Sequence, residues 1–207
     1  VTICPLGDIQ WAGDRKDLTA DRLEAHIKAC LRLPHPLFIG MGDYIDFASP
    51  SNREALKSAK IYDTARKVID DATRALVKEC YDVFLKPTKG KWLGLTQGHH
   101  HYPLRTVQDS DSFLCDLLDA PFLEELGIVN IQWKDATHTQ SINVMAFHGD
   151  SSSVFPHGPL IRLYRVSSQW DCDIVLMGHQ TKKPTGPYDF IKPVFPTKGA
   201  PRLDHRT

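Results

Sequence analysis

Five residues whose side chains can bind metal ions stand at similar places in the sequence. Asp8, Asp43, His99, His148 and His179 each lie at the end of a short apolar run, and glycine adjoins these positions. Residues beyond the carboxyl ends of strands converge in α/β proteins although they are far apart in the chain. Carboxylate and imidazole groups are ligands of Zn, Mn, Fe and Mg ions. The shared placement therefore predicts a metal centre.

Each of these residues has a more ordinary interpretation when it is taken alone. A single aspartate after a strand is more often a turn former or a helix cap than a ligand. A single histidine is more often a surface residue or a satisfied core residue. The common placement of all five favours the metal centre. We read as ordinary the five histidines without that placement, which are His26, His35, His138, His157 and His205.

Strand-like and helix-like segments alternate along the chain. Short β-prone runs predict strands at 2–6, 37–41, 91–97, 128–133, 142–147 and 174–177. Apolar residues at steps of three or four predict helices near 19–33, 54–85, 107–118 and 160–170, the second of them either continuous or broken once. This alternation is typical of an α/β architecture. We expect a single domain over 1–207, with the motifs in 8–181 and a closing strand near Val194 in the basic tail 182–207.

The composition restricts the class of protein. The chain has 207 residues, with 25 basic and 25 acidic side chains, so a general positive field is not expected to hold it on nucleic acid. Its five cysteines form no CxxC pair, which argues against a disulfide scaffold and favours a reducing compartment, the cytoplasm. No apolar run approaches the roughly 20 residues that span a bilayer, and no membrane partner is expected.

The ordered motifs resemble those of the calcineurin-like metallophosphoesterases. That family has the series D-x-H, G-D-x-x-D, G-N-H-[DE], H and G-H-x-H. Here the corresponding blocks begin at Asp8, Gly42, Gly98, His148 and Gly178, so the resemblance covers about residues 3–181. It implies a four-layer α/β/β/α sandwich in which two packed β-sheets are flanked by helices, with two metal ions at the strand ends.

The resemblance also implies a role for each metal ligand. Asp43 would bridge the two ions, and Asp8 would bind the first. His148 and His179 would bind the second. His99 stands where the family has asparagine, and its imidazole is a stronger ligand than an amide.

The same resemblance implies a mechanism. His100 would protonate the leaving oxygen or steady the transition-state phosphate, and Asp46 would orient a neighbouring residue. Metal-bound hydroxide would attack phosphorus, while the two ions neutralise the developing charge.

Two departures from the family pattern affect the first metal ion. Gln10 replaces the histidine of D-x-H, and Thr181 replaces the last histidine of G-H-x-H. Both would be weak oxygen ligands. We therefore expect an asymmetric centre, with Mn or Zn/Fe at the histidine-rich site and a weaker Mg/Mn ion at the oxygen-rich site.

The sequence says less about the substrate. Trp11 and Tyr102 follow two of the motifs and are candidates for a substrate rim on which a base or ring stacks, or equally for packing aromatics. The tail 182–207 carries six basic and two acidic residues, which suits phosphate contacts or an ordinary solvated terminus.

Two functions follow as hypotheses. One is a metal-dependent phosphoesterase that hydrolyses a phosphate ester, in particular a phosphodiester of nucleic acid or a nucleotide. The alternative is a catalytically weak or inactive member of the family that keeps one metal ion and acts as a binding or scaffold module.

Overall fold

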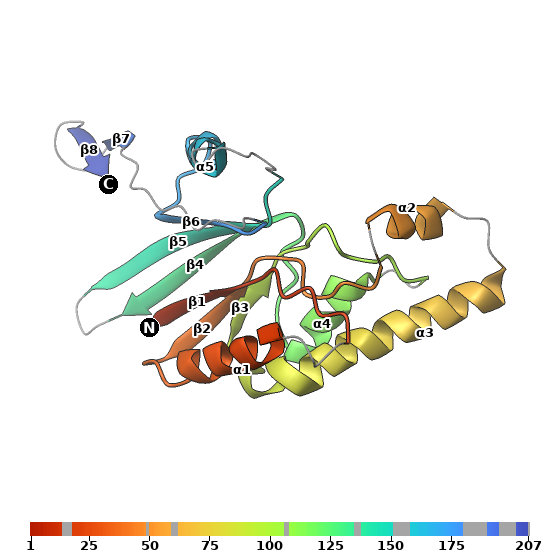
Figure 1. The fold of residues 1–207 in the computed structure, drawn as a ribbon. Helices are drawn as coiled ribbons and strands as arrows, with labels where there is room; N and C mark the ends of the chain where they lie inside the picture. The colour runs from red at the N-terminus through yellow and green to blue at the C-terminus, as the bar shows by residue number, and fades with distance from the viewer. Residues whose placement is uncertain are drawn as a thin grey trace.

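The computed structural model describes residues 1–13, 18–48, 50–58, 62–105, 108–134, 138–150, 158–179, 190–194 and 202–206. It confirms the α/β class predicted from the sequence, because two three-stranded sheets combine with helices (Figure 1). No helix in these described ranges has the length and apolar character to cross a membrane.

The first sheet is parallel. Its strands are ordered β1-β2-β3, with the bounds β1 Thr2–Leu6, β2 Pro36–Gly40 and β3 Trp92–Leu95. Pro5 lies in the edge strand β1, where a missing N–H does not interrupt the ladder of a central strand. Since the three strands run the same way, their carboxyl ends meet at one edge of the sheet.

The second sheet is mixed. Its order is β4-β5-β6, with the bounds β4 Leu126–Lys134, β5 Thr139–Phe147 and β6 Ile174–Met177. Strands β4 and β5 pair antiparallel, whereas β5 and β6 pair parallel. The carboxyl ends of β5 and β6 therefore also lie together.

Helices lie on the outer sides of the two sheets (Figure 1). Figure 1 shows α1, α3 and α4 beside the first sheet and α5 beside β6, with α2 near one end of the molecule. Their bounds are α1 Leu18–Cys30, α2 Pro50–Ser58, α3 Asp63–Cys80, α4 Ser110–Leu118 and α5 Gly158–Ser167. Helix α3 continues into a π-helical turn at Tyr81–Leu85 and a 3₁₀ turn at Lys86–Thr88. The predicted helix 54–85 is thus two helices.

Strand periodicity divides the core. In β2, Phe38 belongs to the cluster that packs with α1, α3 and α4, whereas Ile39 faces the opposite way. In β5, Val144 and Ala146 join Ile39 in a second cluster that contains side chains of both sheets. Met145 belongs to a third cluster with residues of α5 and β6. The alternation arises because successive side chains of a strand point to opposite faces.

The chain end differs from the closing strand predicted near Val194. Strands β7 (Phe190–Val194) and β8 (Arg202–Arg206) pair antiparallel with each other in a separate two-stranded sheet. Neither is ordered with β1–β3 or β4–β6 in the described residues. Which strand pairs with which is a tertiary property, so the sequence pattern near Val194 could not show that its partner is β8.

Candidate metal centre

Strand ends from both sheets bring the predicted ligands together. The Asp8 N–H donates to Gly42 O at 2.9 Å, which joins the ends of β1 and β2. The Gly178 N–H donates to Phe147 O at 3.1 Å, which joins the ends of β6 and β5. Between the sheets, the His179 N–H donates to Asp8 Oδ2 at 3.0 Å. The site is therefore held by backbone hydrogen bonds as well as by side chains.

Glycine at position 98 permits the closest of these approaches. A Cβ built there would lie 2.0 Å from Asp43 N and 2.3 Å from Asp43 Oδ1. The backbone of the β3 end can therefore reach Asp43 only because residue 98 has no side chain. This contact places the His100 N–H, which donates to Asp43 Oδ1 at 2.9 Å.

The backbone around the centre is conformationally unusual. Asp8, Gln10, Asp43 and His179 all have left-handed φ angles, of 51°, 48°, 55° and 59°. Such angles are uncommon for residues other than glycine, and residues that keep them cluster at functional sites. Four such residues close to the predicted ligands indicate that the backbone here is held in a strained conformation, as is common at functional sites.

His148 presents one nitrogen to the centre. Its Nδ1 lies 2.7 Å from Met41 O, and a carbonyl only accepts, so Nδ1 carries a proton. In the neutral ring Nε2 then has a free lone pair. That Nε2 lies 3.0 Å from Asp43 Oδ2 and 3.2 Å from His179 Nδ1. A histidine fixed through its other nitrogen is the usual arrangement of a metal ligand.

Asp43 Oδ2 is a buried acceptor without a hydrogen bond in the described residues. Its carboxylate is fully buried, and its contact with His148 Nε2 at 3.0 Å is an ion pair only when that ring is protonated. A buried carboxylate oxygen without a donor is costly. A cation beside Oδ2 would satisfy it, so the donor set fits a divalent ion.

Two overlapping groups of residues could hold an ion. One is Asp8, Asp43, His148 and His179, and the other is His99, His148 and His179; within each group the ligand atoms lie within 4.8 Å of one another. The sequence prediction assigned Asp8 to a separate ion from the two histidines. In the structure Asp8 lies within reach of the same two histidines, and its assignment to a separate ion stays a prediction. These described residues thus form one contiguous ligand cluster.

Burial and the neighbouring charged groups together shift the pKa values of the cluster residues. Burial acts to raise the pKa of Asp43, but the nearby His148 and the His100 N–H hold it well below its usual range. Burial raises the pKa of Asp8. For His148, burial acts to lower the pKa, but the adjoining Asp43 and Met41 O raise it above the ordinary value. The pKa of His99 is lowered by burial and by His148 and His179.

His100 is held by a second set of contacts. Its Nδ1 lies 3.1 Å from Asp46 Oδ1, and its Nε2 lies 3.7 Å from Asp43 Oδ2. Asp46 also accepts from Arg53 Nη1 at 2.8 Å. Asp46 thus lies in contact with the neighbour it would orient, and the orienting role stays a prediction.

Arg53 was not identified from the sequence. It is 3 % exposed on α2, and its Nη1 also donates to Ala48 O and lies 3.3 Å from His100 Nδ1. A basic residue on a polar helix has the same sequence signature whether it is buried or solvated, so periodicity gave no signal. Asp111 was also missed, because an acidic residue in the first turn of a helix has the same sequence signature whether it is buried or solvated. Its Oδ2 accepts from the Gly98 N–H at 2.9 Å.

Of the two weak ligands predicted for the first ion, the structure describes only Gln10. Gln10 is exposed, and its backbone N–H donates to Asp43 O at 2.9 Å. Thr181 lies outside the described residues.

The substrate-rim prediction for Trp11 and Tyr102 is wrong as a stacking surface. Trp11 is 5 % exposed and packs edge-on against Phe84, with ring centroids 5.0 Å apart. Tyr102 has no exposed surface and packs against Phe47. Both rings join the core because large aromatic side chains stabilise most when they are buried. The packing alternative weighed for each is the one observed.

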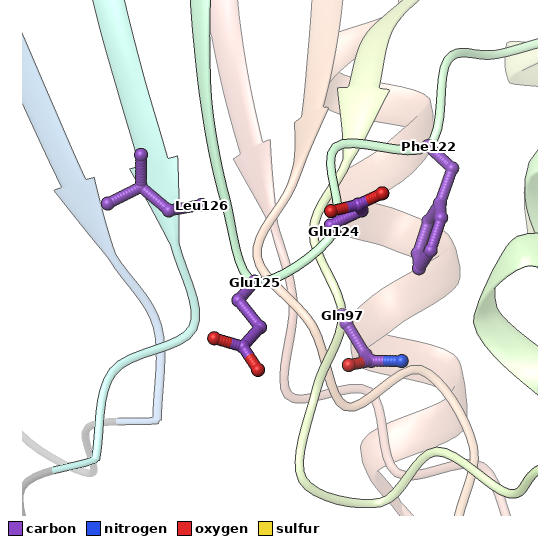
Figure 2. Close-up of a pocket in the computed structure, with 5 residues that line it drawn as sticks. All are labelled: Gln97, Phe122, Glu124, Glu125 and Leu126. Carbon is purple, nitrogen blue, oxygen red and sulfur yellow. The ribbon is translucent and has the colours of Figure 1, made fainter.

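A cavity of about 470 Å³ lies beside the end of β3. Figure 2 shows the side chains that line it, which are Gln97, Phe122, Glu124, Glu125 and Leu126. Gln97 directly precedes Gly98, so this cavity adjoins the metal centre along the chain. Two exposed carboxylates make it a poor site for a phosphate group.

Comparison with protein-family models, curated proteins and solved structures finds no match for this chain. The resemblance to the calcineurin-like metallophosphoesterases stays a prediction carried by the motifs, and the site is interpreted from its own residues.

Proposed function

We propose that the protein is a metal-dependent phosphoesterase that hydrolyses a phosphodiester of nucleic acid or a nucleotide. The observation that carries this proposal is the buried Asp43 Oδ2, which has no hydrogen bond in the described residues and lies 3.0 Å from His148 Nε2 and 3.7 Å from His100 Nε2. A structural metal site needs only the Asp43 carboxylate and the His148 ring. It has no use for an oriented imidazole beside them, whereas hydrolysis of an ester requires a proton donor for the leaving oxygen.

The ligand assignment follows the cluster. Asp8, Asp43, His148 and His179 would hold the principal ion, with His99 as a further ligand at its exposed side. A bound divalent ion would supply an activated water and neutralise charge on the phosphoryl oxygens. The mixed nitrogen and oxygen donors suit Mn or Zn/Fe, and a weaker Mg/Mn ion would depend on Asp8 and Asp43 oxygens.

The residues of this chain would handle the proton. Asp46 accepts from His100 Nδ1, which leaves Nε2 directed to the site. When the ring carries a proton on both nitrogens, Nε2 can donate its proton to the leaving oxygen of the ester, and the neutral ring with its proton on Nδ1 remains. Arg53 neutralises Asp46 and keeps it in place. The left-handed φ angle of Asp43 and the hydrogen bond from the His100 N–H to Asp43 Oδ1 fix the Asp43 carboxylate next to the His100 ring.

The division of the core supports the four-layer sandwich expected for such an enzyme. One cluster contains side chains of both sheets, and the other two each combine one sheet with helices. Such a division of the core is what layers in the order α/β/β/α would produce. A soluble cytoplasmic enzyme is the accompanying proposal for its location.

The alternative of a binding or scaffold module has one observation in its favour. Both candidate ligand groups depend on His148 and His179, and His148 Nδ1 is occupied by Met41 O. The His148 ring can therefore bind only one ion, through Nε2, although both groups need it. A protein with one structural ion would bind metal and show no turnover.

One experiment distinguishes the phosphoesterase from the scaffold module. Metal content is measured by mass spectrometry, and turnover of bis-p-nitrophenyl phosphate is followed with and without added Mn²⁺. We expect about one tightly held ion and Mn²⁺-stimulated turnover, which the His100→Ala variant loses by a factor of about 10² or more while it keeps its metal. The exposed His26→Ala variant on α1 is the matched control.

Full activity of His100→Ala would contradict the catalytic assignment. A tightly held ion without turnover under any added metal would support the scaffold, and absence of metal binding would remove both functions.

A further inference from the structure

Strand β4 forms an open edge of the second sheet in the described residues. It stands at the end of the order β4-β5-β6, and all nine of its residues pair with β5 in one unbroken register. Five of its side chains are exposed, among them Ile128 at 41 % and Trp133 at 45 %. The edge strand of a sheet presents backbone N–H and C=O groups that can pair with a further strand.

The contacts of β5 show which backbone groups of β4 are unused. Asn143 O accepts from the N–H of Asp173, the residue before β6, at 2.9 Å, so the backbone of Asn143 is directed to the β6 side. Asn143 lies opposite Asn130, and the members of an antiparallel pair direct their backbone groups toward each other or away together. The N–H and C=O of Asn130 therefore point to the open side. The alternation along a strand extends this to Ile128 and Gln132, and none of these groups has a hydrogen-bond partner among the described residues.

The other edges of the two sheets are protected in ways that β4 is not. The outer side of β3 is covered, because the Leu95 N–H donates to Pro121 O at 3.0 Å and Leu95 O accepts from the Leu123 N–H at 2.8 Å. Strand β1 has five residues and contains Pro5, and β6 has only four residues. Covering segments, proline and short length protect edges against pairing. Strand β4 has no proline and no bulge, and its one charged residue, Lys134, stands at its end.

The charges at the two ends of β4 favour a second copy of the chain as the partner. Glu124 and Glu125 precede the strand and line the cavity of Figure 2 together with Leu126, the first residue of β4. These two carboxylates and Lys134 are exposed, and none of the three has an ion pair with another described residue. An antiparallel copy brings each lysine to the partner's glutamates, whereas a parallel copy would align like charges.

We propose that β4 pairs antiparallel with β4 of a second copy of the chain, about a two-fold axis at Asn130, so that the two sheets join into one six-stranded sheet. The two Asn130 residues then lie opposite each other, and Ile128 lies opposite the partner's Gln132. Lys134 lies opposite the partner's Leu126, beside the acidic cavity. The outward backbone groups of these residues become paired. The interface uses no residue of the ligand cluster, so it stands apart from the proposed function.

Sedimentation velocity of the full chain gives the first test. We expect a dimer at about 100 µM protein. The variant Asn130→Lys places two lysines opposite each other at the axis and should weaken the dimer at least about tenfold. Ser141→Lys is the matched control, because Ser141 is also exposed and lies opposite Gln132, but on β5 rather than at the edge. It should leave the dimer intact.

A disulfide tests the position of the axis. The Cα atoms of residue 130 in the two copies would lie about 5.5 Å apart, a distance that a disulfide bridges. The five native cysteines are all buried, so mild oxidation of Asn130→Cys should yield a covalent dimer linked through residue 130. Lys134→Cys is the control. Its two Cα atoms would lie about 26 Å apart in the paired strands, so it should give little cross-linking.

Three results overturn the proposal. A monomeric wild-type chain at about 100 µM would show that no second copy occupies the edge and would leave it to a strand of another protein. A dimer that Asn130→Lys leaves intact would use a different surface. Equal cross-linking of Asn130→Cys and Lys134→Cys would reflect random collision, and this comparison decides the question even if Asn130→Lys does not fold.

Discussion

At the scale of single residues, the centre is organised by which nitrogen of each histidine is free. Met41 O holds the proton of His148 on Nδ1, and Asp46 accepts from Nδ1 of His100. Both rings therefore direct Nε2 toward Asp43, although one is a candidate ligand and the other a candidate acid. The difference lies in distance, since His148 Nε2 is 3.0 Å and His100 Nε2 is 3.7 Å from Asp43 Oδ2.

His179→Ala tests the ligand cluster. His179 belongs to both candidate groups, and it is only partly buried, so its loss should remove the ion without unfolding the chain. Metal content should fall from about one ion to below roughly 0.1 per chain. Mass spectrometry after dialysis measures this, and His26→Ala should retain the ion. Retention in His179→Ala would contradict the cluster.

Arg53→Met tests the positioning of His100. The variant leaves Asp46 without its cation, so the imidazole is no longer held, and we expect kcat to fall about 10- to 100-fold with metal content and KM unchanged. Arg53→Lys should recover part of the loss. Arg105→Met is the matched control, because Arg105 forms a similar ion pair with Asp70, with Nε 3.2 Å from Oδ2. An equal loss in both variants would point to general destabilisation.

At the scale of elements, the centre exists because strand ends approach one another without intervening side chains. The β3 end meets the β2 end at Gly98 and Asp43, and the two sheets meet through His148 and Met41. The sequence predicted strands close to β1–β6 and the candidate ligands that follow β1, β2, β3, β5 and β6, since those five are short apolar runs next to glycine. It did not predict β8. It did not predict the partner of each strand, because pairing is a long-range property.

Gly98→Ala tests this close approach. The added Cβ would overlap Asp43 N, so we expect a loss of about 3 kcal/mol or more in the free energy of unfolding, together with loss of the bound ion. Gly90→Ala is the control. Its Cβ would meet no atom within 4 Å, and its φ of 71° alone should cost about 1 kcal/mol. Urea unfolding measures both, and equal costs would show that the contact is not tight.

At the scale of the whole molecule, three apolar clusters hold the two sheets and their helices together, and one buried acid connects this core to the centre. Asp111, in the first turn of α4, is 2 % exposed and accepts from the Gly98 N–H. Burial raises its pKa to about 7. The stability of the fold and the geometry of the centre are therefore linked through one carboxyl group.

The global stability should depend on pH through Asp111. The unfolded carboxyl loses its proton near its ordinary pKa of 3.8, whereas the folded one keeps it to about pH 7. The folded state binds more protons in this window, so its stability should fall as pH rises from about 4 to 7, by at most about 1.4 kcal/mol per unit. Urea unfolding at several pH values should show a smaller slope for Asp111→Asn. An unchanged slope would exclude this group as the cause.

The sequence by itself determined the α/β class and the residues at the strand ends, because apolar periodicity and the adjoining glycines are local properties. Tertiary structure decided which side chains meet. It grouped Asp8 with His148 and His179, and it brought Arg53 from α2 to His100. It also turned Trp11 into the core, since burying an aromatic ring stabilises more than exposing it beside a site. Such contacts join distant segments, and only the packing of the two sheets and their helices specifies them.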